Sequence, residues 1–205
     1  MGFNTKRKGV VIASNEISPI QRNIFFVDLK TGKRTRMDEG GKGWHSASLS
    51  KSGQYIYDNY SEPNVPRNIA IVNVANGKCF SYFKAEDPWK GYKVPEYTFG
   101  TVKAADGTTD LYWRMVKPVD FDPNKKYPLI VYYYGGTTPT TRGITSPYCA
   151  QLFASRDYVV YVIQPSGAIG YGQEFSARHV NAWGERTADE IIEGTKKFCA
   201  SVCQR

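Results

Sequence analysis

A chain of 205 residues is long enough for one large domain or two small ones. Hydrophobic residues make up 41% of the chain and aromatic residues 14%, so it can bury a core, and the aromatic share favours β-structure. The net charge is +8, and three basic residues form a cluster at positions 6–8. The other basic residues are scattered along the chain, which is typical of a solvated surface. Nucleic-acid binding is therefore ranked last among the functions considered.

The first residues are basic and lead into a short apolar run, residues 10–13. This run is too short for the hydrophobic region of a signal peptide and too short to span a membrane. No targeting segment is therefore predicted within the chain.

The first half of the chain repeats itself. Residues 22–33 return as residues 67–78, which is 45 positions later, and residues 8–13 match residues 52–57. Each copy is an alternating strand, a Thr-Gly-Lys or Asn-Gly-Lys turn and a second strand, which together predict a hairpin. Short strands at this period are typical of β-propeller blades.

Two copies cannot close a propeller ring. The chain is therefore expected to be either a piece of a larger propeller or a pair of stacked hairpins. The larger propeller is favoured, because a blade buries its faces against neighbours on both sides. The partial propeller of about two blades is predicted to occupy residues 1–84.

A polar segment with Pro and Gly, residues 85–96, is predicted to be a linker. After it, residues 97–102 and 111–116 flank the turn Ala105-Asp106-Gly107-Thr108, which predicts a second kind of hairpin.

The most informative stretch is residues 127–136, an apolar, β-branched and aromatic run that stops at Gly135 and Gly136. It predicts a parallel strand buried on both faces. Ligands meet the carboxyl ends of strands in such sheets, so Tyr134 and the two glycines are expected where a substrate would bind. A tyrosine hydroxyl there can donate to developing negative charge. A plain strand followed by a tight turn is the alternative.

Further along, residues 148–155 predict a short helix with Cys149, Leu152 and Phe153 on one side, and residues 158–163 predict another buried strand. This strand runs into a loop at residues 164–171, again at a carboxyl end.

A last helix is predicted from Thr187, which with Glu190 forms a capping box. Its face towards a sheet is expected to carry Ala188, Ile191, Ile192, Phe198, Cys199 and Val202. Strand, helix, strand and helix in this order indicate the opening of an α/β fold.

The four cysteines, Cys79, Cys149, Cys199 and Cys203, contain no Cys-x-x-Cys pair. Only Cys199 and Cys203 have a spacing that would let them share a ligand, and both histidines are distant in sequence. No metal site is predicted, and buried free thiols are expected.

These features together resemble the prolyl oligopeptidase family, and within it the dipeptidyl peptidase IV branch. The resemblance covers nearly the whole chain and depends on the order of its parts. These are two blades, a linker, the hairpin from Thr98 to Val116, Lys125-Lys126-Tyr127-Pro128 leading into Tyr133-Tyr134-Gly135-Gly136, and Gly170-Tyr171-Gly172 followed by Trp183-Gly184 and a capped helix. It implies propeller blades followed by the N-terminal part of an α/β-hydrolase domain, residues 97–205.

Members of this family are serine peptidases in which an α/β-hydrolase domain cleaves peptides, often after proline, and a propeller restricts access. The resemblance places the oxyanion-stabilising tyrosine at Tyr134, whereas Tyr132 and Tyr133 are expected to pack. The loop from Ser166 to Tyr171 departs from the branch's Asp-Gly-Arg-Gly form, so no specific role is expected for it.

The resemblance also implies a peptide substrate. No cofactor and no nucleic-acid partner are expected. The resemblance leaves a homodimer open for the full-length protein and favours a periplasmic or secreted location.

The catalytic triad is expected to lie beyond this chain. An α/β-hydrolase presents its nucleophile in a Gly-x-Ser-x-Gly motif, followed by an acid and then a histidine, and the motif does not occur here. His179 precedes the expected nucleophile and His45 lies in a predicted blade, so structural or surface roles are expected for both. The acidic cluster that binds a substrate amino terminus in this branch is expected in earlier propeller sequence.

Two functions follow. The chain is expected to contribute Tyr134 and part of a propeller wall to a serine peptidase, while being inactive alone. The alternative is a non-catalytic, propeller-based module that binds a protein partner.

Overall fold

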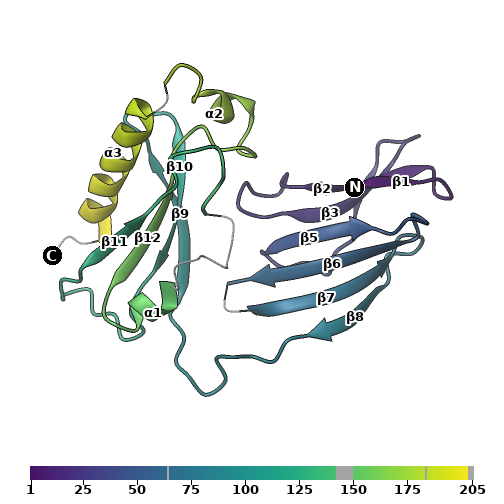
Figure 1. The fold of residues 1–205 in the computed structure, drawn as a ribbon, viewed down its shortest axis with the longest axis horizontal. Coiled ribbons are helices and arrows are strands. Elements are labelled where there is room, and N and C mark those ends of the chain that lie inside the picture. Colours follow the sequence, from purple (N-terminus) through teal and green to yellow (C-terminus); the bar gives the residue numbers. More distant parts are fainter. Residues whose placement is uncertain (64, 142–149, 183, 203–205) are drawn as a thin grey trace. The chain divides into compact units, whose positions relative to one another are not determined.

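The computed structural model describes residues 1–63, 65–141, 150–182 and 184–202. The chain divides into two compact units, Met1–Lys90 and Gly91–Arg205 (Figure 1). The limits of 1–84, 85–96 and 97–205 for propeller, linker and hydrolase parts remain predictions. Within the described part of the chain, no helix is both long and apolar enough to cross a membrane.

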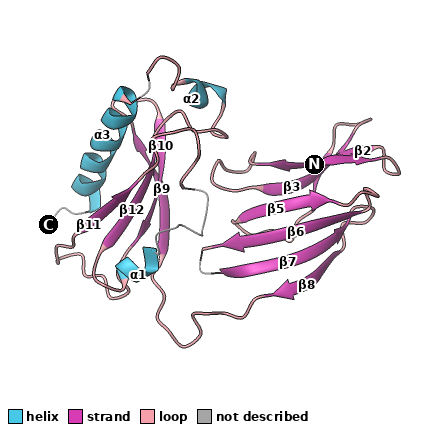
Figure 2. Cartoon of the chain, viewed as in Figure 1, coloured by secondary structure: helices cyan, strands magenta, loops and turns pink. Residues whose placement is uncertain are grey.

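The first unit consists of two four-stranded antiparallel sheets in which neighbouring strands follow one another along the chain (Figure 2). The first sheet contains β1 (Gly2–Asn4), β2 (Gly9–Ser14), β3 (Asn23–Asp28) and β4 (Arg34–Arg36). The second contains β5 (Trp44–Leu49), β6 (Tyr55–Glu62), β7 (Val65–Asn73) and β8 (Cys79–Lys84). Four strands in simple up-and-down order are the structure of a propeller blade, which confirms the prediction of two blades.

The sequence repeat is also a repeat of turn geometry. Gly32 and Gly77, equivalent in the two copies, have φ angles of 70° and 72°. Each donates its backbone N–H to the last residue of the preceding strand, Asp28 or Asn73, at 2.8 Å. A left-handed backbone of this kind favours glycine, which explains why both turns keep Gly before Lys.

The two sheets of the first unit share one core. Buried residues of the first sheet and the segment after it pack with buried residues of the second, namely Val11, Ile24, Phe26, Met37, Ile56, Val72 and Val74. The opposite face of the second sheet is apolar as well, because Tyr57, Ile71 and Phe80 lie in register across three strands. Tyr57 and Phe80 are exposed there.

His45 lies at a buried position of β5, where its Nδ1 is 2.6 Å from Asp58 Oδ2. Its ring stacks on Tyr60 at a centroid distance of 4.4 Å. A buried, paired histidine within a blade has a structural role, as expected from its place in the chain.

The second unit has a single mixed sheet with strand order β11-β12-β10-β9. It consists of β9 (Tyr97–Lys103), β10 (Asp110–Val116), β11 (Leu129–Tyr132) and β12 (Val159–Gln164), together with the helices α1 (Ala150–Ala154), α2 (Gln173–Ala177) and α3 (Glu185–Val202). β9 and β10 form the predicted hairpin, and β11 runs parallel to β12.

Helices cover both faces of this sheet. On one face, Ile191 and Phe198 of α3 pack with Tyr161 and Ile163 of β12. On the other, α1 packs on alternate residues of the same strand, including Val160 and Val162. Every residue of β12 is buried, so this strand is the centre of the second unit.

Two expectations about strands and helices are wrong. β11 covers only four residues, all half-buried, because β12 lies between it and β10 and leaves β11 at the edge of the described sheet. α1 turns Ala150 and Ala154 inwards, whereas Leu152 is exposed. Cys149, Trp183 and Cys203 lie outside the described residues.

The predicted start of α3 is also wrong. The helix begins at Glu185, so Thr187 lies inside its first turn and the pair with Glu190 is no capping box. The buried face carries Thr187, Glu190, Ile191, Gly194 and Phe198, while Ala188 and Ile192 are exposed.

Candidate functional site

Two loops meet at one edge of the second unit's sheet. β11 and β12 are parallel, with Tyr132 opposite Val162, so their carboxyl ends lie at the same edge. The chain continues from β11 through residues 133–141 and from β12 through residues 165–172. A backbone hydrogen bond joins the two loops, since the Ile169 N–H donates to Thr137 O at 3.0 Å. This is the place in an α/β sheet where ligands bind.

Tyr134 lies in the first of these loops, and its side chain is 53% exposed. The ring packs over Gly136, where an added Cβ would lie 2.7 Å from Cε1 and 3.3 Å from the hydroxyl oxygen of Tyr134. A side chain at position 136 would therefore displace the phenol. Gly135 in turn approaches Thr187 of α3, whose Cγ2 would be 3.4 Å from an added Cβ. The two glycines thus hold Tyr134 close to its own backbone and to α3.

A pocket of about 480 Å³ lies beside Tyr134. Residues 133–136 form one wall and α3 forms the other, with the exposed apolar side chains of Ala188 and Ile192. Tyr133 also lines this pocket and is 51% exposed, so the expectation that it packs is wrong. Tyr132 does pack, against the cluster that contains α1.

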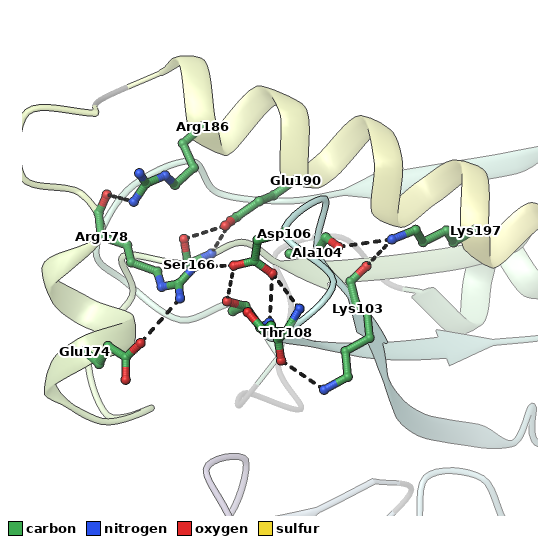
Figure 3. Close-up of polar contacts among 11 residues, drawn as sticks. Lys103, Ala104, Asp106, Thr108, Ser166, Glu174, Arg178, Arg186, Glu190 and Lys197 are labelled. Carbon is green, nitrogen blue, oxygen red and sulfur yellow. Dashed lines mark hydrogen bonds and ion pairs between the residues drawn. The ribbon is translucent and has the colours of Figure 1, made fainter.

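Glu190 fixes the second loop to α3 (Figure 3). Its two carboxylate oxygens accept the backbone N–H and the hydroxyl of Ser166, each at 2.7 Å. Both residues are buried. This contact gives the loop a structural role, while the expectation that its residues have no specific functional role stays a prediction. The sequence does contain a signal for this contact, because Glu190 lies on the buried face of α3 and a buried carboxylate requires hydrogen-bond partners.

The turn of the β9–β10 hairpin carries a second polar cluster (Figure 3). Asp106 accepts the Thr109 hydroxyl at 2.5 Å and pairs with Arg178 at 2.7 Å. These bonds, the one from Thr109 first, hold the pKa of Asp106 well below its ordinary value of 3.8. The stability that they contribute is complete above pH 3.8 and is lost as the pH falls further, towards the lowered value. The charges here are paired within the chain, which indicates a structural cluster.

The thiols do not form a reactive site within the described residues. Cys79 and Cys199 are half-buried, and neither is part of a disulfide bond. Burial, together with a hydrogen bond to Glu39, raises the pKa of Cys79 to about 12, so its thiol stays protonated at neutral pH. In the part of the chain that the structure describes, no three His, Cys, Asp or Glu side chains gather in a way that would hold a metal ion.

Two family models match the chain. Residues 1–67 match the model described as "Dipeptidyl peptidase IV (DPP IV) N-terminal region", and residues 145–202 match "Prolyl oligopeptidase family". The first match falls on the blades. The second falls on the segment that contains β12 and α3, which supports its assignment to the N-terminal part of an α/β-hydrolase domain.

Curated relatives are dipeptidyl peptidases. Dipeptidyl peptidase 8 of Homo sapiens is 25% identical over 202 residues, which cover 92% of this chain and 22% of the relative. Probable dipeptidyl-aminopeptidase B of Botryotinia fuckeliana is 27% identical over 204 residues, which cover 96% of this chain and 22% of the relative. The chain thus spans less than a quarter of the length of these relatives.

Solved structures share the fold. A putative dipeptidyl aminopeptidase IV from Bacteroides ovatus has a TM-score of 0.82 and 34% identity, over 98% of this chain and 29% of that one. Dipeptidyl peptidase 4 of Porphyromonas gingivalis has a TM-score of 0.79 and 23% identity, over 93% of this chain and 28% of that one. The shared fold extends over nearly the whole of this chain.

Proposed function

We propose that this chain, which belongs to the prolyl oligopeptidase family, forms part of a serine peptidase that cleaves peptides in the manner of the dipeptidyl peptidase IV branch. In this proposal residues 1–84 contribute about two blades of a propeller wall. Residues 85–96 link them to residues 97–205, the N-terminal part of the peptidase domain.

One observation carries the proposal. Tyr134 follows a parallel strand at the carboxyl edge of the sheet, is exposed and lines a pocket against α3. A phenolic hydroxyl at that edge can donate to the oxygen of a tetrahedral intermediate, where negative charge develops as the carbonyl is attacked. We assign Tyr134 this role, together with a backbone N–H beside the nucleophile.

The proposed nucleophile, acid and base lie outside these 205 residues, because the sequence contains no Gly-x-Ser-x-Gly. β11 pairs only with β12 in the described sheet, so its other edge is available for a further strand beside Tyr134. A strand ending in the nucleophile elbow would bring the serine to the same edge of the sheet. The serine would attack the scissile carbonyl. The Tyr134 hydroxyl would donate a hydrogen bond to the oxyanion without transferring its proton.

The substrate in this proposal is a peptide, and the proposed compartment is the periplasm or the exterior of the cell. A homodimer of the complete protein is part of the same proposal. The propeller would limit the size of the peptides that reach the site.

Activity measurements on two preparations test the proposal. The 205-residue chain is expected to give no hydrolysis of a Gly-Pro or Ala-Pro chromogenic dipeptide, because it lacks the nucleophile. The complete protein is expected to hydrolyse it and to lose that activity on serine-directed labelling. Hydrolysis by the isolated chain that is lost on the same labelling would contradict the placement of the triad.

A propeller-based binding module is the second candidate, favoured by the apolar row formed by Tyr57, Ile71 and Phe80. Exposed apolar patches mark surfaces that bind partners. The same assay separates the two functions, because a non-catalytic module predicts no hydrolysis by the complete protein.

A further inference from the structure

The loop that carries Tyr134 follows β11 and contacts the neighbouring strand, β12, at both of its ends. At one end, Tyr132 pairs with Val162 in the parallel ladder between β11 and β12. At the other, Thr140 contacts Gln164, the last residue of β12. The two anchors are two residues apart on one strand, about 7 Å. Residues 133–139 therefore form a loop that is held against β12 at both ends, with Tyr134 near its start.

Gln164 supplies the second anchor through its side chain. Its Oε1 accepts the Thr140 N–H at 2.6 Å and the Thr140 hydroxyl at 3.2 Å. Its Nε2 donates to Pro165 O at 3.1 Å, which orients the amide so that the oxygen faces the loop. The side chain is 0% exposed, so these bonds form away from water, where an unmade bond is costly.

The strand end that carries Gln164 is itself held in place. Ser166 is bound by Glu190 of α3, and Ile169 donates to Thr137 O in the middle of the Tyr134 loop. These contacts fix the position of the loop relative to α3 and to β12, whose residues are all buried. None of these contacts involves the Tyr134 hydroxyl.

We propose that Gln164 is a positioning residue for Tyr134. By accepting hydrogen bonds from Thr140, it closes the loop and determines where the phenol lies over Gly136. This inference rests on the proposed role of Tyr134 in the peptidase. It predicts that Gln164 affects the reaction only through that hydroxyl, because its amide is buried beneath the loop and directed at Thr140.

The test uses the complete protein and a Gly-Pro chromogenic dipeptide. Gln164→Met keeps a similar volume but removes the acceptor, and it is expected to lower kcat roughly tenfold to a hundredfold, because small displacements of a reacting group have effects of this size. KM is expected to change less than about twofold, since the loss is specific to the transition state. Gln173→Met, at an exposed position in the same unit, is the matched control and is expected to leave kcat unchanged.

A double-mutant cycle distinguishes positioning from a general structural effect. In a Tyr134→Phe background, Gln164→Met is expected to cause no further loss of kcat, because the group that it positions is already absent. An equal loss in both backgrounds, or an unchanged kcat in Gln164→Met, would overturn the inference. If Tyr134→Phe alone leaves kcat unchanged, the proposed function fails first.

Thr140→Val provides a second route if Gln164→Met does not fold. It removes only the hydroxyl contact at 3.2 Å and keeps the backbone bond. We expect a loss of kcat of about threefold, again absent in the Tyr134→Phe background. A loss that persists in that background would contradict the inference.

Discussion

Replacing Tyr134 with phenylalanine in the complete protein is expected to lower kcat about 10²- to 10³-fold, the usual effect of removing one oxyanion donor. The substitution removes a single oxygen from a side chain that is 53% exposed, so the fold is expected to be unaffected. The ring, which packs over Gly136, is retained. The loss is therefore expected in the chemical step and not in folding. Steady-state kinetics with a chromogenic dipeptide measure it.

Tyr133→Phe is the matched control. Tyr133 lines the same pocket and is exposed to a similar extent, 51%, but the ring that packs over Gly136 is that of Tyr134. Its kcat is expected to stay within about twofold of the unmodified protein. A comparable loss of kcat in both variants would show that the rate depends on the pocket as a whole and not on the Tyr134 hydroxyl. An unchanged kcat in Tyr134→Phe would contradict the assignment.

Phe198→Ala is expected to destabilise the second unit by about 3–5 kcal/mol, the range for removing a large aromatic side chain from a core. The Phe198 ring is buried and stacks on Tyr161 at a centroid distance of 3.8 Å. It also meets the edge of Trp113 at 5.6 Å. These contacts join α3 to the centre of the sheet, so their loss leaves a cavity under the helix. Hydrogen exchange of the β12 amides, whose opening reports unfolding of the unit, measures the effect.

Ile192→Ala on the same helix is the control for this substitution. Ile192 is 51% exposed and faces the pocket beside Tyr134, so its truncation is expected to cost less than about 1 kcal/mol. If both substitutions reduce β12 protection equally, the position of α3 on the sheet is not the one described. If Phe198→Ala has no effect on exchange, the core does not depend on this stack.

Local patterns in the sequence predicted the first unit and the hairpin of the second. The hairpin turns before Lys33 and Lys78 depend on glycines that lie within the turns themselves. The repeated hairpins can therefore be predicted from the local sequence, without knowledge of the fold. β12 was equally clear, because a continuous run of apolar residues is typical of a strand covered on both faces.

The errors arose where long-range pairing decides the outcome. The apolar run at residues 127–136 resembles a central strand, but strand order places β12 between β10 and β11 and leaves β11 half-buried. Thr187 and Glu190 have the spacing of a capping box, yet the helix begins earlier and directs both side chains inwards. A local motif cannot reveal which face of a helix meets a sheet.

The candidate site depends both on local sequence and on long-range contacts. Tyr134 was proposed from residues next to it in the chain and from the family resemblance. The contacts that hold its loop, Gln164 with Thr140 and Glu190 with Ser166, each join residues 24 positions apart and carry no periodic signal. Only the fold brings these side chains together.

The most direct test is a crystal structure of the complete protein with a serine-directed dipeptide phosphonate, whose phosphonyl oxygen stands in for the oxyanion of the tetrahedral intermediate. The hydroxyl oxygen of Tyr134 is expected to lie about 2.7–3.1 Å from that oxygen. A phosphonyl oxygen bound by other groups, with the Tyr134 hydroxyl beyond hydrogen-bonding distance, would contradict this expectation.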